Sequence, residues 1–356
     1  MGSLYTKFKM FYFKDKIDSL PLDKAEILPP THIRIKPTNM CNHRCTYCAY
    51  LAPALQLGQD MVVKDFIPRK KMLEIVDDII SMGVRAVTFS GGGEPFCYPY
   101  LLDTARRLAS SPVKFAALTN GSLVKGEIAE VFAHSATWLR ISMDGWDDIS
   151  YMKYRGVSDG EFTKILSNIV RFKKLKGKCY LGVSIIIDRG NVAHIFDLVK
   201  VLKESGVDSV KFSPCIVSNS GVKNNEYHAA IFQAAKDQIS RSRSELEDKN
   251  LEIFDSYHEQ LSTFKKEYAW CPYLQVLPVI GADLNVYSCH DKAYNLAEGL
   301  LGSIKDKRLR DFWFSDKNNF FKINPSVHCN HHCVAHERNR VILDYLNVDR
   351  EHLEFV

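Results

Sequence analysis

The sequence of 356 residues has no internal repeat, no low-complexity tract and no long apolar run. A membrane-spanning helix needs about 20 consecutive apolar residues, and no stretch reaches that length. The first 16 residues show no apolar segment followed by a small-residue cleavage site, so we expect no secretion signal. The net charge is only +5 and the charges are dispersed, which does not predict a nucleic-acid partner. We therefore expect a protein that binds neither membrane nor nucleic acid.

Cysteine, by contrast, is abundant, and its distribution argues against a disulfide framework. Ten cysteines in a secreted protein would suggest disulfides, but seven of them fall into two groups with metal-like spacing. Metal-binding thiolates must stay reduced, so the sequence predicts a cytoplasmic protein. Hydrophobic residues make up 46% of the chain, which suffices for one large domain and a smaller appendage.

The first cysteine group is Cys41, Cys45 and Cys48, with CxxxCxxC spacing, directly after the strand-like run 32–35. Three thiolates on one short loop can hold three irons of a [4Fe–4S] cluster and leave one iron without a protein ligand. An open iron is what a catalytic cluster needs, because substrate or cofactor must reach the metal. The alternatives are three incidental core thiols or a zinc knuckle. Zinc would require a fourth ligand, for which His43 is the nearby candidate, and its usual spacing is a paired CxxC.

A glycine-rich turn follows the next strand-like run, at 84–89. Gly91, Gly92 and Gly93 allow close backbone approach to a ligand, and their N–H and C=O groups become the contacts. Glu94 then supplies a carboxylate that can hold an ammonium group. Alone, such a turn after a strand is more often a tight turn than a ligand site.

Residues 31–220 alternate between strand-like and helix-like patterns. The strands are predicted at 32–36, 84–90, 113–119, 137–143, 179–187 and 207–213. The helices are predicted at about 69–82, 98–110, 125–133, 160–176 and 191–205. This alternation predicts an α/β fold with a parallel sheet, and six strands fit a partial (β/α)6 barrel of TIM type. In that geometry functional residues gather at the C-terminal strand ends, where the cysteine loop and the glycine turn both lie.

Three further segments flank the predicted barrel. Residues 1–30 are expected to be an N-terminal lead-in that packs on it, and residues 221–266 are charged and predict a connecting helical segment. Residues 267–356 predict a small cysteine-rich extension. It begins with a β-hairpin from Leu274–Ile280 and Leu284–Ser288, and a helix follows at about 304–315.

The extension contains the second cysteine group, Cys271, Cys289, Cys329 and Cys333. A hairpin brings its ends together, so all four thiolates can face one metal centre. Four thiolates suit either a fully ligated [4Fe–4S] cluster or a structural zinc site. Four histidines near the last two cysteines leave zinc open, although we expect them outside the ligand set. They are His328, His331, His332 and His336.

Together, the cysteine loop and the Gly-Gly-Glu turn resemble the radical S-adenosylmethionine (SAM) superfamily, whose motif carries an aromatic residue before the third cysteine. Tyr47 occupies that position. The resemblance implies a partial barrel and a [4Fe–4S] cluster on the first cysteine group that binds SAM. Residues 267–356 resemble the twitch or truncated SPASM extension, which implies an auxiliary [4Fe–4S] cluster on the second group. The additional cysteines of a full SPASM domain are absent.

The resemblance also implies roles for individual residues. The backbone of Gly91–Gly93, with Glu94, would receive the SAM ammonium, and Ser142 and Arg155 would hold its carboxylate. Asn120 would contact the ribose. An electron donor such as flavodoxin or ferredoxin would reduce the cluster, and SAM would then yield a radical that abstracts a hydrogen atom from unactivated carbon.

The leading functional hypothesis is an oxidoreductase that dehydrogenates a small polar metabolite, similar to a sugar or an aminocyclitol. The spacing of the second cysteine group resembles that of aminocyclitol dehydrogenases of the superfamily. One alternative is a redox-neutral epimerase in which Cys215, at a predicted strand end, donates a hydrogen atom. Another is a SPASM-type maturase, so a peptide substrate stays open. A non-catalytic, zinc-stabilised binding protein is the alternative from a different class. Cys97 and Cys179 are predicted to be small buried residues.

Overall fold

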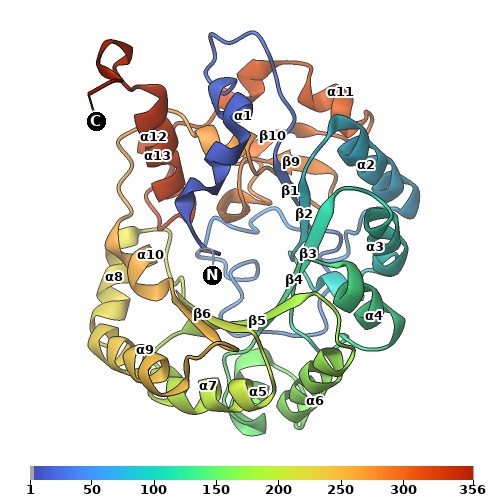
Figure 1. Ribbon diagram of the computed structural model, residues 1–356, viewed down its shortest axis with the longest axis vertical. Helices are drawn as coiled ribbons and strands as arrows, with labels where there is room; N and C mark the ends of the chain where they lie inside the picture. The colour runs from blue at the N-terminus through green and yellow to red at the C-terminus, as the bar shows by residue number, and fades with distance from the viewer. Residues whose placement is uncertain (1–3, 356) are drawn as a thin grey trace.

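The computed structural model describes residues 4–355, and its centre is one curved sheet (Figure 1). Neighbouring strands from β1 to β7 run parallel and follow one another in sequence order. They are β1 (His32–Ile35), β2 (Ala86–Phe89), β3 (Lys114–Thr119), β4 (Trp138–Ser142), β5 (Tyr180–Ile187), β6 (Ser209–Pro214) and β7 (Glu252–Asp255). The sheet confirms the predicted α/β fold with a partial barrel.

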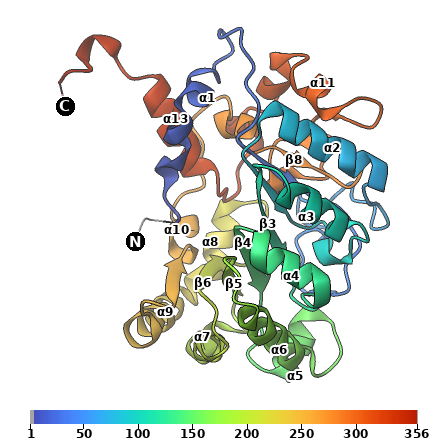
Figure 2. The same cartoon turned by 45° about the vertical axis from the view of Figure 1, so that its right-hand side comes forward.

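Helices cover the outer face of this sheet, as Figures 1 and 2 show. They are α2 (Arg69–Met82), α3 (Leu101–Ala109), α4 (Gly126–Ser135), α6 (Glu161–Lys174), α7 (Ile195–Glu204) and α9 (Phe232–Leu246). The strands and helices predicted for residues 31–220 are present, with ends that differ by a few residues. Helix α5 (Asp148–Arg155), which follows β4, was not predicted.

The strands bury alternate residues against these helices. Ile33 and Ile35 of β1 and Val210 and Phe212 of β6 are fully buried in the core between the sheet and the helices. Because side chains alternate along a strand, the residues between them face the barrel interior. That interior carries polar and charged side chains, which Arg34 of β1 exemplifies.

The segment 221–266 is not the single connecting helix that the sequence predicts. It forms α8 (Gly221–Ala229), α9, strand β7 and α10 (Tyr257–Ser262), and β7 extends the parallel sheet beyond the six predicted strands. Strand β7 has only four residues, so it shows no distinct alternation in a charged stretch.

The C-terminal residues extend the same sheet on its other side. Strand β8 (Val279–Ile280) pairs in parallel with β1, and β9 (Asn285–Tyr287) and β10 (Leu300–Ser303) follow as antiparallel neighbours. The predicted hairpin is therefore present with shorter strands, whereas β10 was not predicted. The helix predicted at about 304–315 is reduced to α11 (Leu309–Trp313).

The two ends of the chain pack together beside this sheet. The N-terminal segment forms a 3-10 helix (Lys7–Phe13) and α1 (Lys14–Asp18), and the C-terminal segment forms α12 (Pro325–His328) and α13 (His336–Leu346). Ile17 of α1 and Ile342 of α13 share a small apolar cluster, and Figure 2 shows the two helices side by side. Within residues 4–355, none of the helices combines the length and apolar character needed to cross a membrane.

Candidate active site

One cavity of about 370 Å³ lies at the C-terminal ends of the barrel strands. This volume falls in the range of small-molecule sites. All the residues that the sequence predicts for the first cluster, for SAM and for hydrogen donation line it. They are Cys41, Cys45, Tyr47, Cys48, Gly91, Gly92, Gly93, Glu94, Asn120, Ser142, Arg155 and Cys215.

The cysteine loop is held in place by the end of α5. The Arg44 amide donates to the Arg155 carbonyl at 2.8 Å, and the Thr46 amide donates to the Tyr154 carbonyl at 3.0 Å. Gly156 ends α5 with a φ of +57°, and a Cβ there would lie 2.5 Å from the Arg44 carbonyl oxygen. Glycine is required at this position because only it combines the left-handed backbone with so close an approach.

The glycine turn is packed against the residues that lead into the cysteine loop. The Gly93 amide donates to Thr38 O at 3.1 Å, and the Glu94 amide donates to Met40 O at 2.9 Å. A Cβ on Gly93 would lie 2.1 Å from Met40 O, and one on Gly92 would lie 2.2 Å from the Asn39 side-chain oxygen. The sequence predicts that these glycines allow a ligand to approach. The structure adds a second requirement, because a side chain at Gly92 or Gly93 would collide with the residues that lead into the cysteine loop.

The Glu94 carboxylate already accepts three hydrogen bonds within the protein. Its donors are the Thr119 hydroxyl at 2.6 Å, the Asn120 amide at 2.7 Å and the Phe96 amide at 3.0 Å. Burial raises the pKa of Glu94 and the three hydrogen bonds oppose that shift. The carboxylate thus joins the turn after β2 to the end of β3. Two carboxylate oxygens can accept more than three bonds, so a ligand ammonium would be a further donor.

Arg155 forms a buried ion pair with Asp144. Its Nη2 donates to Asp144 Oδ2 at 2.5 Å, and its Nη1 lies 3.6 Å from the Cys45 sulfur. The two side chains are 5% and 0% exposed, respectively. Asp144 also accepts hydrogen bonds from the Tyr47 hydroxyl and from the Ile186 amide. Asp144 therefore fixes both the arginine and the aromatic residue of the cysteine motif.

Sequence reasoning did not assign a role to Asp144. The available signal was an acidic residue directly after a barrel strand, in Ser142-Met143-Asp144-Gly145. The Ser142 hydroxyl lies 3.4 Å from that of Ser184, which makes at most a weak hydrogen bond. Ser142 also lines the cavity.

Asn120 and Cys215 differ in how firmly the protein holds them. The Asn120 side-chain amide donates to the Asn42 side-chain oxygen at 2.8 Å, and its own oxygen accepts from the Ser122 amide. Cys215 is 6% exposed, and burial raises the pKa of its thiol to about 12. The thiol is thus protonated at neutral pH. Cys179 is buried as predicted, but Cys97 is partly exposed because its loop borders the cavity side of the cysteine motif.

A second, smaller cavity is lined by all four cysteines of the C-terminal group, Cys271, Cys289, Cys329 and Cys333. The segments that carry them are far apart in sequence and meet between β9, α12 and α13. Burial raises the pKa of Cys271 to about 11 and that of Cys289 and Cys329 to about 12. The positive charge of bound metal would offset this effect, because a coordinating thiol is deprotonated.

The spacing of the sulfurs can be compared with the spacing that a single zinc ion requires. Zinc–sulfur bonds of about 2.3 Å place two sulfurs on one zinc at most about 4.6 Å apart. Among the described residues, no three cysteine sulfurs lie within 4.8 Å of one another, in either group. In the described structure, therefore, neither cysteine set has three sulfurs as close together as a single zinc ion requires.

One tighter group of ligand atoms exists beside the second cavity. Atoms of Asp291, His331 and Cys333 all lie within 4.8 Å of one another. Asp291 Oδ2 and His331 Nε2 are 4.0 Å apart, and both are buried without a hydrogen-bond partner. This trio is the position at which a single zinc ion would compete with a cluster.

Comparison with known proteins identifies the family. The sequence profile described as the radical SAM superfamily matches residues 35–217, about half of the chain. The chain belongs to the radical SAM superfamily. Proteins of this superfamily carry a [4Fe–4S] cluster and bind SAM, and the residues that the sequence predicts for both line one cavity.

Relatives with assigned activities match only in part. An S-adenosylmethionine-dependent nucleotide dehydratase of Lacinutrix mariniflava is 30% identical over 115 residues, which cover 32% of this chain and 23% of that protein. A GTP 3′,8-cyclase of Pseudomonas putida is 24% identical over 190 residues, 50% of this chain and 51% of the relative. The chain thus spans about half, or less, of the length of these curated relatives.

Solved structures are similar in fold to this chain over most of its length. Streptococcus suis SuiB, bound to the precursor peptide SuiA, matches with a TM-score of 0.64 at 18% identity and covers 88% of this chain and 71% of SuiB. The anSMEcpe protein with bound AdoMet matches with a TM-score of 0.59 at 18% identity, over 89% of this chain and 95% of that protein. At this identity the likeness establishes the radical SAM fold.

Proposed function

We propose that this radical SAM enzyme holds an auxiliary [4Fe–4S] cluster in a twitch- or SPASM-like unit at residues 267–356 and oxidises a small polar metabolite by two electrons. The observation that carries this proposal is the second cavity. Four cysteines line it, and no three of their sulfurs lie within the 4.8 Å of one another that sulfurs on one zinc ion would occupy. A redox-capable centre beside the barrel could accept the second electron that an oxidation of the substrate releases.

The electrons and atoms of such an oxidation balance as follows. One substrate C–H hydrogen passes to the 5′-deoxyadenosyl group that bound SAM supplies, one electron passes to the auxiliary cluster, and one proton leaves to a base. The substrate CH–OH thereby becomes C=O. An external donor such as flavodoxin or ferredoxin would supply the electron that SAM cleavage consumes.

The proposed substrate is a sugar or an aminocyclitol-like compound. The cavity of about 370 Å³ falls in the range of small-molecule sites, and the names of the curated relatives indicate nucleotide substrates for those proteins. A peptide substrate is the alternative, since SuiB was solved with its precursor peptide. In this proposal residues 31–220 form the catalytic barrel, with the lead-in at 1–30 and the segment 221–266 as supporting parts.

Metal content tests the auxiliary cluster. We expect about eight irons per chain in the wild type and about four after Cys41, Cys45 and Cys48 are all replaced by alanine. Zinc should be absent from both proteins. Cys97→Ala is the matched control, because Cys97 lies outside both cysteine groups, and it should keep all the iron. Zinc in the triple variant, bound at the Asp291–His331–Cys333 trio, would contradict the proposal.

A redox-neutral epimerase is the second candidate, and the position of Cys215 favours it. Its thiol lines the same cavity as the cluster cysteines and is protonated at neutral pH. A thiol there would return a hydrogen atom to the substrate radical from the opposite face.

Turnover in deuterated water separates the two candidates. The wild type would be incubated with SAM, a reductant and a panel of sugars, aminocyclitols and their phosphate esters. We expect a product two mass units lighter than its substrate, without deuterium, and the same product from Cys215→Ala. A product with one deuterium at carbon, lost in Cys215→Ala, would overturn the oxidation and establish the epimerase.

A further inference from the structure

The inner face of the barrel sheet carries three basic side chains from three different strands: Arg34 of β1, Arg140 of β4 and Lys211 of β6. Each lies between two residues that are fully buried against the outer helices, as in Leu139-Arg140-Ile141. The alternation of a strand therefore directs each basic side chain to the interior. Barrels of this type are usually filled by bulky apolar side chains.

Arg140 and Lys211 share one aromatic neighbour, and the charge of Arg34 acts on Lys211. The ring of Tyr5 lies 5.3 Å from the Arg140 guanidinium carbon and 4.9 Å from Lys211 Nζ, so both cations contact one aromatic face or its edge. Burial, and then the charges of Arg140, Arg338 and Arg34 among others, lower the pKa of Lys211 to about 8. Arg34 also lines the cavity that contains the cluster cysteines. The basic group thus extends from beneath the SAM site toward Tyr5.

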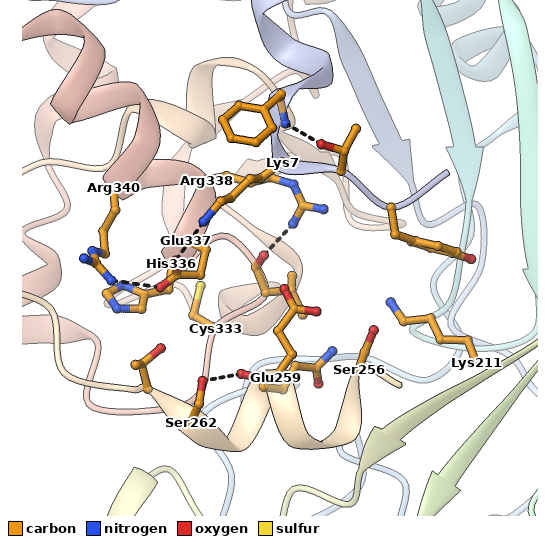
Figure 3. Close-up of a pocket in the computed structure, with 16 residues that line it drawn as sticks. Lys7, Lys211, Ser256, Glu259, Ser262, Cys333, His336, Glu337, Arg338 and Arg340 are labelled. Carbon is orange, nitrogen blue, oxygen red and sulfur yellow. Dashed lines mark hydrogen bonds and ion pairs between the residues drawn. The ribbon is translucent and has the colours of Figure 1, made fainter. Parts of the chain in front are cut away.

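Within the described part of the chain, carboxylates act on these cations only at longer range: Asp291 on Arg34, and Glu259 on Lys211. In residues 4–355, none of Arg34, Arg140 and Lys211 forms an ion pair or a side-chain hydrogen bond. The Nε atoms of both arginines are buried without a hydrogen-bond partner. Glu259 lines the same cavity of about 610 Å³ as Lys211, and Figure 3 draws no hydrogen bond or ion pair between the two side chains. Burying unpaired charge is costly, so these side chains are arranged for an external anion.

We propose that the substrate carries a phosphate or diphosphate group, which Arg34, Arg140 and Lys211 bind inside the barrel. This inference rests on the proposed function, a reaction on a small polar metabolite, and names its charged part. Guanidinium groups match phosphate oxygens with paired N–H donors, and the lysine adds a point charge. Arg34 belongs to the three basic residues and also lines the cavity that contains the cluster cysteines, so the rest of the substrate would extend toward the cluster. A free aminocyclitol ammonium would be repelled here.

Inorganic pyrophosphate is the probe that tests this inference. Calorimetric titration of the anaerobically purified, cluster-loaded protein should show one pyrophosphate per chain. Arg140→Gln and Lys211→Met should each weaken binding by about tenfold or more, because each removes a charged donor. Lys211→Arg should retain binding. The matched control is Arg69→Gln, since Arg69 is exposed on α2 and pairs with Asp103, and it should bind as the wild type does.

Two outcomes overturn the inference. One is a wild type that does not bind pyrophosphate. The other is an affinity in Arg140→Gln and Lys211→Met equal to that of the wild type at unchanged iron content. Saturating SAM is added in a further arm, in which pyrophosphate should still bind. Competition with SAM would place the anion in the SAM site instead and refute the assignment. Because the titration needs no turnover, its failure leaves the proposed oxidation standing, and failure of the oxidation leaves this binding result intact.

Discussion

Replacing Arg155 by alanine is expected to lower the free energy of unfolding by about 3–5 kcal/mol, because it leaves the buried carboxylate of Asp144 without its partner. The variant should also bind SAM more weakly by about tenfold or more, as Arg155 lines the SAM cavity and lies beside the Cys45 sulfur. Urea unfolding under anaerobic conditions measures the first effect, and equilibrium binding of SAM measures the second.

A double variant separates the two roles of Arg155. In Arg155→Met with Asp144→Asn, both charges are removed while the asparagine side-chain oxygen can still accept from the Ile186 amide, so much of the lost stability should return. SAM binding should stay weak. SAM affinity restored along with stability would show that Arg155 acts only on the fold, and stability unchanged in Arg155→Ala would refute the buried pair.

Gly93→Ala should disable the site by displacing the backbone, since it removes no side chain that could contact a ligand. Its Cβ would lie 2.1 Å from the Met40 carbonyl, so the turn or the cysteine loop must move. We expect a loss of stability of about 1–3 kcal/mol from overpacking. We also expect SAM cleavage to fall by about 100-fold, since misplacement of reacting groups by about 1 Å has effects of that size. The yield of 5′-deoxyadenosine per chain measures the cleavage.

Gly126→Ala is the control for that substitution. Gly126 has a φ of +61° and open space around it, so alanine there brings backbone strain of about 1–2 kcal/mol without contact with the site. Its SAM cleavage should equal that of the wild type. Wild-type cleavage in Gly93→Ala as well would mean that the turn does not position the cysteine loop.

Local pattern explains the elements that sequence alone predicted well. In α2, Met72, Ile75, Val76 and Ile79 repeat at three- and four-residue intervals, and the predicted bounds of this helix agree with the structure. Strands β7 and β10 have four residues each and lie at or near the sheet edges, where few buried side chains create a pattern. Such short elements depend on pairing with distant strands, which one sequence does not reveal.

The residues of the candidate site likewise divide into those that sequence alone predicts and those that only the fold brings together. The cysteine loop and the glycine turn are contiguous motifs, so their residues could be named from sequence. The partnership of Arg155 with Asp144 depends on how α5 folds back onto the end of β4, and the basic group of Arg34, Arg140 and Lys211 depends on closure of the barrel. In sequence those three cations stand alone between apolar residues. Only curvature of the sheet turns them toward one another.

The pairing of β1 with β8 has a consequence for how the chain folds. Arg34 lies opposite Val279, so this contact joins residues about 245 positions apart in the chain. Contacts of such long range form slowly, because a large loop must close before they are made. Until residues 267–356 emerge during synthesis, β1 exposes an unpaired edge to other chains. The C-terminal extension therefore also completes the sheet, and protection against aggregation arrives only with the last quarter of the protein.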